Sequence, residues 1–282
     1  MSVITLQEAA DRLGVHYMTA YRYVRTGRLD ATKEGALWQV DTDDLTAFIE
    51  GKDPQEPTAA LTPYDNAWLR LHKRLVAGDE AGSWNIVEEC LASGMTPRNL
   101  YERLITPAMT EVGERWAAGE LEVADEHLAT AIMTRLIGRL GPQFVQRGRS
   151  RGSVVLAMIA GDDHSLPTSM LADLLRLERF DVIDLGANTP GESVVKTARK
   201  ADRLVAVGLC SVAGNATSSM SATLELLHTA GFGQRTFIGG GGVKESDREA
   251  ISPSPLVTGS AQDVIDFVDG LTRSASTTSK AS

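Results

Sequence analysis

The sequence contains few cysteines and no long hydrophobic segment. Its two cysteines, Cys90 and Cys210, lie far apart and belong to neither a disulfide framework nor a metal-binding spacing. The longest fully apolar stretch, Val154–Ala160, is much shorter than the roughly 18–20 residues that cross a bilayer. The first residues lack the basic stretch and apolar core of a secretory signal. We therefore expect a cytoplasmic protein with no membrane partner.

An excess of positive charge is also absent. The 28 lysines and arginines are outnumbered by 37 acidic residues, which gives a net charge of −9. This balance argues against nucleic-acid binding along the whole surface, because phosphate contacts need a basic surface. One short stretch differs, since the residues from His16 to Arg28 include three arginines and no acid. The charge therefore permits a local nucleic-acid contact there.

Length and composition divide the chain into several parts. At roughly 150 residues per domain, 282 residues predict two or three modules, and 43% hydrophobic residues are typical of globular chains. We expect a multidomain fold with a winged helix-turn-helix, a four-helix bundle and an α/β doubly wound parallel sheet of the flavodoxin-like kind. The expected parts are residues 1–50, a linker at 51–63, the bundle at 64–147, the α/β domain at 152–271 and a disordered tail at 272–282.

The first fifty residues have the spacing of a helix-turn-helix followed by a wing. Thr5–Glu8 fits a capping box that opens a helix running to about Leu13. A second short helix is predicted at Tyr17–Arg25, a two-stranded wing at 27–40 and a third helix at 45–49. The second helix would then enter the major groove of DNA.

The residues of this segment indicate a DNA contact, with a surface module for protein binding as the alternative. The candidate DNA-binding residues are Tyr17, Thr19, Arg22, Arg25 and Arg28. The string from Leu6 to Leu45 resembles the winged-helix domain shared by MerR-type regulators and phage excisionases, which implies operator DNA as a partner. Because one such module contacts few phosphates, a homo-oligomer (dimer or tetramer) would raise its occupancy.

The middle and last segments differ in their hydrophobic pattern. Between 64 and 145, apolar residues recur at helical spacing with breaks near Gly78, Ser93 and Ala118, which predicts four helices. After residue 152, short strand-like runs alternate with small-residue loops and helical stretches. These runs are Ser153–Ala160, Asp181–Leu185, Leu204–Leu209 and Thr236–Ile238. The alternation predicts a parallel sheet covered on both faces, with ligands at the carboxyl ends of its strands.

The loop after the first of these strands carries a histidine with a carboxylate two residues before it. Asp162 can accept one ring N–H of His164 and so make the other nitrogen a better metal ligand. The alternative is structural, with Asp163 or Thr168 capping the next helix and His164 as an ordinary loop residue.

Small residues follow the other strands. The loops at 186–190 and 210–214 are short of bulky side chains, and residues 239–242 are four consecutive glycines. A large group can approach a backbone without side chains, although a flexible turn would need the same glycines. No Gly-x-Gly-x-x-Gly follows the first strand, so a dinucleotide is not favoured. The pattern favours an elongated cofactor with a metal at one end.

This segment resembles the cobalamin-binding domain, whose signature combines Asp-x-His-x-x-Gly with a serine and a Gly-Gly pair. The matching residues are Asp162, His164, Ser211, Gly239 and Gly240. The resemblance implies that His164 replaces the dimethylbenzimidazole tail on cobalt and that the tail enters a groove beside the sheet. Pro167 stands in place of the motif's glycine and Ala213 in place of its leucine or threonine. A shifted cobalamin or another tetrapyrrole is therefore an alternative.

A third motif lies in the predicted bundle. Trp116 is followed after nine residues by Glu126 and His127. Taken alone, the tryptophan could be core packing and the Glu126–His127 pair a solvated helix face. With its flanking domains the motif resembles the CarH/LitR family of light-sensing repressors. The resemblance implies adenosylcobalamin, with these three side chains around the adenosyl group. It also implies an oligomer that binds its operator in the dark and dissociates when light cleaves the cobalt–carbon bond.

One position departs from that family. Ala117 occupies the place of a histidine that binds cobalt after photolysis, and only His127 could replace it on the motif. Because Ala117 replaces that histidine, a protein that responds to the level of its cofactor rather than to light is also an alternative. Two further functions stay open: a corrinoid carrier for methyl transfer, and a DNA-binding sensor of another tetrapyrrole such as haem. No nucleophile–base set is visible, so we expect the chain not to be an enzyme.

Overall fold

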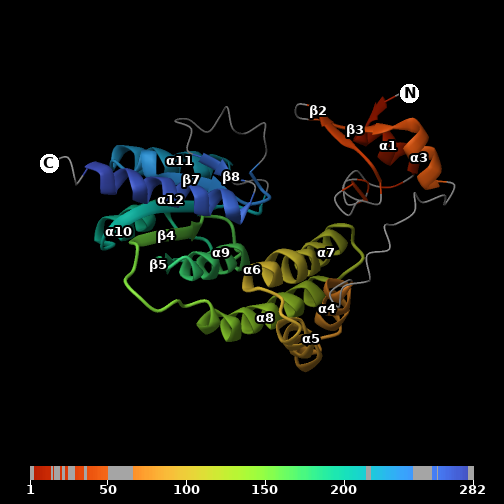
Figure 1. The fold of residues 1–282 in the computed structure, drawn as a ribbon, viewed down its shortest axis with the longest axis horizontal. Coiled ribbons are helices and arrows are strands. Elements are labelled where there is room, and N and C mark those ends of the chain that lie inside the picture. Colours follow the sequence, from red (N-terminus) through yellow and green to blue (C-terminus); the bar gives the residue numbers. More distant parts are fainter. Residues whose placement is uncertain are drawn as a thin grey trace. The chain divides into compact units, whose positions relative to one another are not determined.

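The computed structural model describes residues 3–13, 15, 20, 23–24, 29–34, 37–49, 66–213, 217–243, 256–258 and 260–278. The chain forms two compact units, Met1–Thr62 and Pro63–Ser282 (Figure 1). Among the residues described, no helix combines the length and the apolar character that a bilayer crossing requires.

The first unit combines short helices with an antiparallel sheet. Its described elements are β1 (Val3–Thr5), α1 (Leu6–Leu13), β2 (Thr32–Glu34), β3 (Leu37–Asp41) and α3 (Thr42–Ile49). The predicted capping box is confirmed, because the Thr5 N–H donates to Glu8 Oε2 at 2.8 Å and the Glu8 N–H donates to Thr5 Oγ1 at 3.3 Å.

The two-stranded wing was an incomplete prediction. The sheet has three strands in the order β1-β3-β2, with Val3 paired to Asp41. Strand β1 was missed because its three residues are too few to show a periodic pattern. Its partner strand β3 lies more than thirty residues away in the chain. Most of the second predicted helix, Tyr17–Arg25, lies outside the described residues.

The second unit begins with a helical bundle. Its elements are α4 (Ala67–Val76), α5 (Glu80–Ala92), α6 (Pro97–Asn99), the π-helix η1 (Leu100–Ile105), α7 (Thr106–Ala117), α8 (Val123–Leu140) and the 3-10 turn η2 (Gly141–Gln143). The predicted breaks are confirmed, and η1 joins α6 to α7 as one run. Asp79 caps α5 by accepting the Gly82 N–H at 2.8 Å, and Thr96 caps α6 ahead of Pro97.

A parallel α/β domain follows the bundle. Its elements are β4 (Ser153–Met158), α9 (Leu166–Leu177), β5 (Asp181–Asp184), α10 (Gly191–Lys200), β6 (Leu204–Cys210), α11 (Thr217–Thr229), the 3-10 turn η3 (Gly233–Arg235), β7 (Thr236–Gly239), β8 (Leu256–Thr258) and α12 (Ala261–Thr278). The strand order β5-β4-β6-β7-β8 is that of the flavodoxin-like fold, as predicted. The fifth strand, β8, was not predicted from the sequence.

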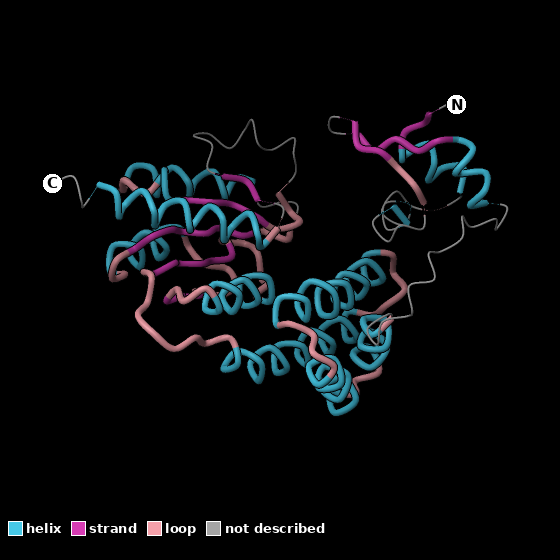
Figure 2. Tube along the Cα trace, viewed as in Figure 1, coloured by secondary structure: helices cyan, strands magenta, loops and turns pink. Residues whose placement is uncertain are grey.

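Helices cover both faces of this sheet (Figure 2). Along β4, Val155 and Ala157 pack with α10 and α11, whereas Val154 and Leu156 pack with α9 and α12. This alternation buries both faces and explains why the strand is apolar throughout.

The bundle packs on the α9 side of the domain. Leu166 and Leu174 of α9 belong to the hydrophobic core of the bundle. The Tyr101 hydroxyl donates to the buried Asp173 carboxylate at 2.7 Å, which adds a polar link between η1 and α9. Helix α9 therefore belongs to both layers.

The prediction of a disordered tail at 272–282 is wrong for residues 272–278, which are helical. Helix α12 continues to Thr278, and only the last four residues lie outside the description. Val264, Ile265 and Val268 anchor the helix in the core, and no proline or glycine follows Gly270 to stop it. Small polar residues can extend a helix that is already anchored, since propagation adds a hydrogen bond for each residue.

Candidate functional site

The loop between β4 and α9 holds the Asp162–His164 pair that the sequence predicts. Asp162 Oδ1 lies 2.6 Å from His164 Nδ1 and 3.1 Å from the His164 backbone nitrogen. The Asp162 side chain is fully buried, whereas the His164 side chain is 52% exposed. The carboxylate therefore occupies the Nδ1 side of the ring and leaves Nε2 as the nitrogen that could bind a metal.

Donors from the end of β6 surround the second oxygen of Asp162. Asp162 Oδ2 accepts the N–H groups of Val212 at 2.6 Å and Ala213 at 3.0 Å, and the Ser211 hydroxyl at 3.1 Å. Burial by itself would raise the pKa of Asp162, but the hydrogen bonds from Ala213, His164 and Val212 outweigh it and lower the pKa to about 2. The carboxylate is therefore charged at neutral pH and can orient His164.

Asn188 also fixes this loop, and the sequence analysis missed it. Asn188 Oδ1 accepts the Gly161 N–H at 2.8 Å, its Nδ2 donates to Asp163 Oδ1 at 3.1 Å, and its backbone N–H donates to the Asp162 carbonyl at 2.8 Å. Its φ of 48° is in the left-handed region, which asparagine tolerates better than most residues. An asparagine in a loop of small residues was the available signal.

The capping alternative for this loop is wrong. Asp163 bonds to Asn188 rather than to a helix N–H, and the N-cap residue of α9, Ser165, makes no side-chain cap bond. The Thr168 hydroxyl donates to the Ser165 carbonyl instead of accepting an N–H. Pro167 lies in the first turn of α9, where a helix does not need the missing N–H. The departure from the motif at Pro167 therefore leaves the loop intact.

The glycine run packs backbone against backbone. A Cβ on Gly240, whose φ is 100°, would lie 2.1 Å from the Ser211 carbonyl oxygen, and one on Gly242 would lie 2.7 Å from that of Val212. The Gly239 carbonyl accepts the Ser211 N–H at 3.0 Å. These glycines hold the Ser211 loop in place, so the group that approaches Gly240 is the chain's own backbone.

Other glycines at this edge are open. A Cβ built on Gly161, Gly186 or Gly241 meets no heavy atom within 4 Å. They follow β4, β5 and β7, whose carboxyl ends meet at one edge of the parallel sheet. Bare backbone at three strand ends, next to an exposed imidazole, fits a large flat group better than a small ion.

The bundle motif lies where α7 ends and α8 begins. Trp116 is 48% exposed, so core packing is wrong for this residue. The Glu126 carboxylate accepts the Thr130 hydroxyl at 2.7 Å and lies 3.7 Å from His127, whose side chain is 74% exposed. Within the described residues, no hydrogen bond or ion pair joins this motif to the His164 loop. The DNA-binding candidates Tyr17, Thr19, Arg22, Arg25 and Arg28 lie outside the described residues.

Models of known families match three parts of the chain. B12 binding domain models match residues 69–140 and 152–264, and a helix-turn-helix domain model matches residues 3–53. The first two matches cover the bundle and the parallel sheet. They fit a cobalamin-binding protein, in agreement with the Asp162–His164 geometry.

Curated relatives are similar over part of their length. The chain is 33% identical over 125 residues to trimethylamine corrinoid protein 1 of Methanosarcina acetivorans, which is 43% of this chain and 58% of that protein. It is 27% identical over 194 residues to trimethylamine corrinoid protein 1 of Methanosarcina mazei, which is 67% of this chain and 89% of that protein. These relatives are corrinoid proteins by name, so a light-sensing repressor stays a prediction.

A solved structure shares the fold. The monomethylamine corrinoid protein of Methanosarcina barkeri superposes with a TM-score of 0.61 at 18% identity, over 71% of this chain and 95% of that one. This likeness confirms the predicted combination of a helical bundle with a parallel flavodoxin-like sheet.

Proposed function

We propose that this chain binds a corrinoid at the edge formed by β4, β5 and β7, where His164 would bind its cobalt through Nε2. The 2.6 Å contact between Asp162 and His164 Nδ1 carries the proposal, because it orients the half-exposed ring and leaves Nε2 as the nitrogen available to a metal. When bound, the corrinoid supplies a cobalt–carbon bond that can be made and broken.

The residues of the chain hold and orient this group. Asp162 stays charged because Ser211, Val212 and Ala213 donate hydrogen bonds to it, so it can hold the Nδ1 side of the imidazole and orient the ring. The open backbone at Gly161, Gly186 and Gly241 would leave room for the ring. In this proposal the chain catalyses no reaction itself.

The first use of the corrinoid that we propose is as a carrier of methyl groups. It is favoured by the relatives, which are corrinoid proteins named for methylamines, and one of which is matched over 89% of its length. An exposed cofactor edge suits a carrier, since a partner enzyme must reach the cobalt.

A second use, corrinoid-controlled DNA binding, is favoured by a different observation. The helix-turn-helix model matches residues 3–53, and the described part of that unit has a three-stranded sheet against α1. In this proposal the candidates Tyr17, Thr19, Arg22, Arg25 and Arg28 contact an operator. A homo-oligomer joins two or more such units, and adenosylcobalamin with light is the signal to test first.

Replacing His164 tests the site. We expect purified wild type to bind cobalamin and, after reduction to cobalt(II), to show an electron paramagnetic resonance spectrum that changes when its histidines carry ¹⁵N. His164→Ala should lose this nitrogen signal and bind cobalamin at least about tenfold more weakly. His228→Ala is the matched control, because His228 is an exposed histidine near the end of α11. Loss of the signal in the control alone would refute the assignment.

Two assays on the loaded protein separate its uses. A gel shift with the DNA upstream of its own gene, with and without adenosylcobalamin and in the dark or under green light, tests the regulator. Transfer of a labelled methyl group from protein-bound methylcobalamin to a thiol, catalysed by an added methyltransferase, tests the carrier. A cofactor-dependent shift without methyl transfer would favour the regulator, and the reverse result would favour the carrier.

A further inference from the structure

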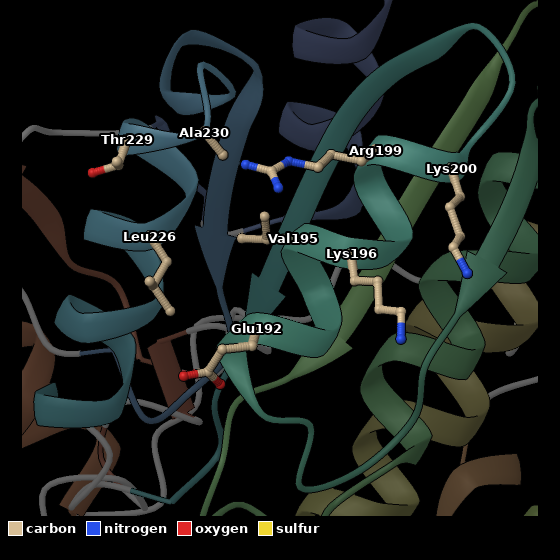
Figure 3. Close-up of a pocket in the computed structure, with 8 residues that line it drawn as sticks. All are labelled: Glu192, Val195, Lys196, Arg199, Lys200, Leu226, Thr229 and Ala230. Atoms are coloured by element: carbon tan, nitrogen blue, oxygen red, sulfur yellow. The ribbon is translucent and has the colours of Figure 1, made fainter.

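A groove lies between α10 and α11 (Figure 3), and no residue of the His164 loop lines it. Its volume is about 550 Å³. Helices α10 and α11 cover the sheet face that holds Val155 and Ala157, whereas the bundle packs against α9 on the other face. Within the second unit, the bundle therefore leaves the groove uncovered.

One glycine explains why the groove opens at only one end. A Cβ on Gly191, the first residue of α10, would lie 2.9 Å from Thr223 Oγ1 and 3.1 Å from Leu226 Cδ1. The two helices therefore touch at this end. Farther along α10, the lining passes to Val195 and Arg199, opposite Leu226 and Ala230. A shallow channel results that is closed near Gly191.

Three cations line the α10 side of the channel. Lys196, Arg199 and Lys200 are exposed, and none of them forms an ion pair or a side-chain hydrogen bond within the described part of the chain. In Figure 3, Arg199 extends between the two helices toward Ala230, whereas Lys196 and Lys200 extend from the outer side of α10. The chain as a whole carries a net charge of −9, so this unpaired basic group stands apart from the average surface.

The opposite wall is mostly apolar, with Leu226 and Ala230 beside Thr229. Leu226 is 38% exposed and Val195 is half-buried between the helices. An exposed leucine beside unpaired cations is a combination that a partner with both apolar and acidic groups would cover.

We infer that this groove docks an acidic amphipathic helix of a protein partner. Its leucine-sized side chains would pack between Val195 and Leu226, and its carboxylates would meet Arg199 and the two lysines. A third helix fits the channel between two packed helices, since side-chain ridges pack into such grooves.

Nucleic acid and small anions fit the groove less well. The apolar side chains Val195 and Leu226 between the helices offer nothing to a phosphate backbone. A small anion would need cations held in place by neighbouring groups, whereas Lys196, Arg199 and Lys200 are held by none. A flexible basic rim around an apolar channel suits a protein surface.

Binding of a designed peptide tests the inference. The probe is a labelled synthetic helix of about 15 residues with leucines on one face and glutamates beside them. Its binding to the full chain is measured by fluorescence anisotropy at low salt. The charge-reversal variant K196E/R199E/K200E should weaken binding at least about tenfold, and the single variants Arg199→Gln and Leu226→Gln should each weaken it about threefold or more.

The matched control reverses three exposed arginines elsewhere, R103E/R147E/R149E, and so changes the net charge by the same amount. It should change the peptide's affinity less than about threefold. Circular dichroism and cobalamin uptake check that each variant is folded. Equal affinity in wild type and the K196E/R199E/K200E variant would overturn the inference. So would equal binding of a peptide with glutamine for each glutamate, or a DNA duplex that competes for the same cations.

Discussion

At the scale of single residues, Asp162 forms the hydrogen bonds that connect the loops of the site. It bonds to His164 two residues away, to Ser211 on the end of β6, and through its carbonyl to Asn188 after β5. Residues from three strand ends therefore bond to Asp162, two of them through its carboxylate and one through its carbonyl. The carboxylate–imidazole spacing was visible in the sequence, because both groups lie in one short loop. The donors from Val212 and Ala213 are backbone groups, which no side-chain pattern reveals.

Removing the Asn188 side chain should loosen the loop without straining the backbone. Asn188→Gly keeps the left-handed conformation but loses the bonds to Gly161 and Asp163. We expect cobalamin affinity, measured by titration of the purified protein, to fall about tenfold.

Asn66→Gly is the matched control for Asn188→Gly. Asn66 is also left-handed, with φ 67°, and its side chain makes no cap bond. Cobalamin affinity should be unchanged in this control. An equal loss of affinity in both variants would mean that glycine acts by loosening the chain in general.

At the scale of elements, the helical pattern predicted the run from Pro97 to Ala117 but not its π-helical part. The segment Leu100–Ile105 keeps helical spacing closely enough that periodicity cannot distinguish the two forms. This segment contributes to tertiary packing through Tyr101. The Tyr101 ring stacks on Phe144 with ring centroids 4.9 Å apart, and its hydroxyl donates to Asp173 of α9. Burial and the Asp173 carboxylate raise the pKa of Tyr101 far above its usual value, so the hydroxyl remains a donor.

Tyr101→Phe should weaken the link between the bundle and the α/β domain. The substitution leaves one buried oxygen of Asp173 without its donor, which costs about 1–3 kcal/mol of unfolding free energy. Urea denaturation followed by circular dichroism measures this loss. Thr134→Val removes an exposed hydroxyl whose hydrogen bond, among the described residues, is to the Thr130 carbonyl, and it should change stability by less than about 0.5 kcal/mol. Equal stability of Tyr101→Phe and wild type would show that the hydroxyl contributes nothing to the link.

At the scale of the whole molecule, the two units have separate hydrophobic cores. The core of the first unit contains residues from Leu6 to Leu45, and the cores of the second unit contain residues from Ala67 to Val268. The residues that match the B12 binding domain models lie wholly in the second unit. From composition, the sequence predicts a proline-containing linker at 51–63, which lies outside the described residues, and the boundary between the two units falls after Thr62.

Deleting the first unit should therefore leave corrinoid binding intact. A chain that starts at Pro63 retains every described contact of Asp162, His164 and Asn188. We expect its cobalamin affinity to match that of the full chain within about twofold. Any shift of DNA in the gel assay should disappear. A much weaker affinity for cobalamin would contradict the independence of the units.

The sequence by itself determined the order of the parts, most helices and strands and the Asp162–His164 pair. These features are local, since hydrophobic period and short spacings are properties of neighbouring residues. Only the tertiary structure decided the third strand of the first sheet, the strand β8, the clamp by Asn188 and the groove beside Gly191. Each of these joins residues that are distant in the chain and that meet only when the sheets and their covering helices form. The end of α12 was decided in the same way, because its anchorage in the core carries the helix into a polar tail.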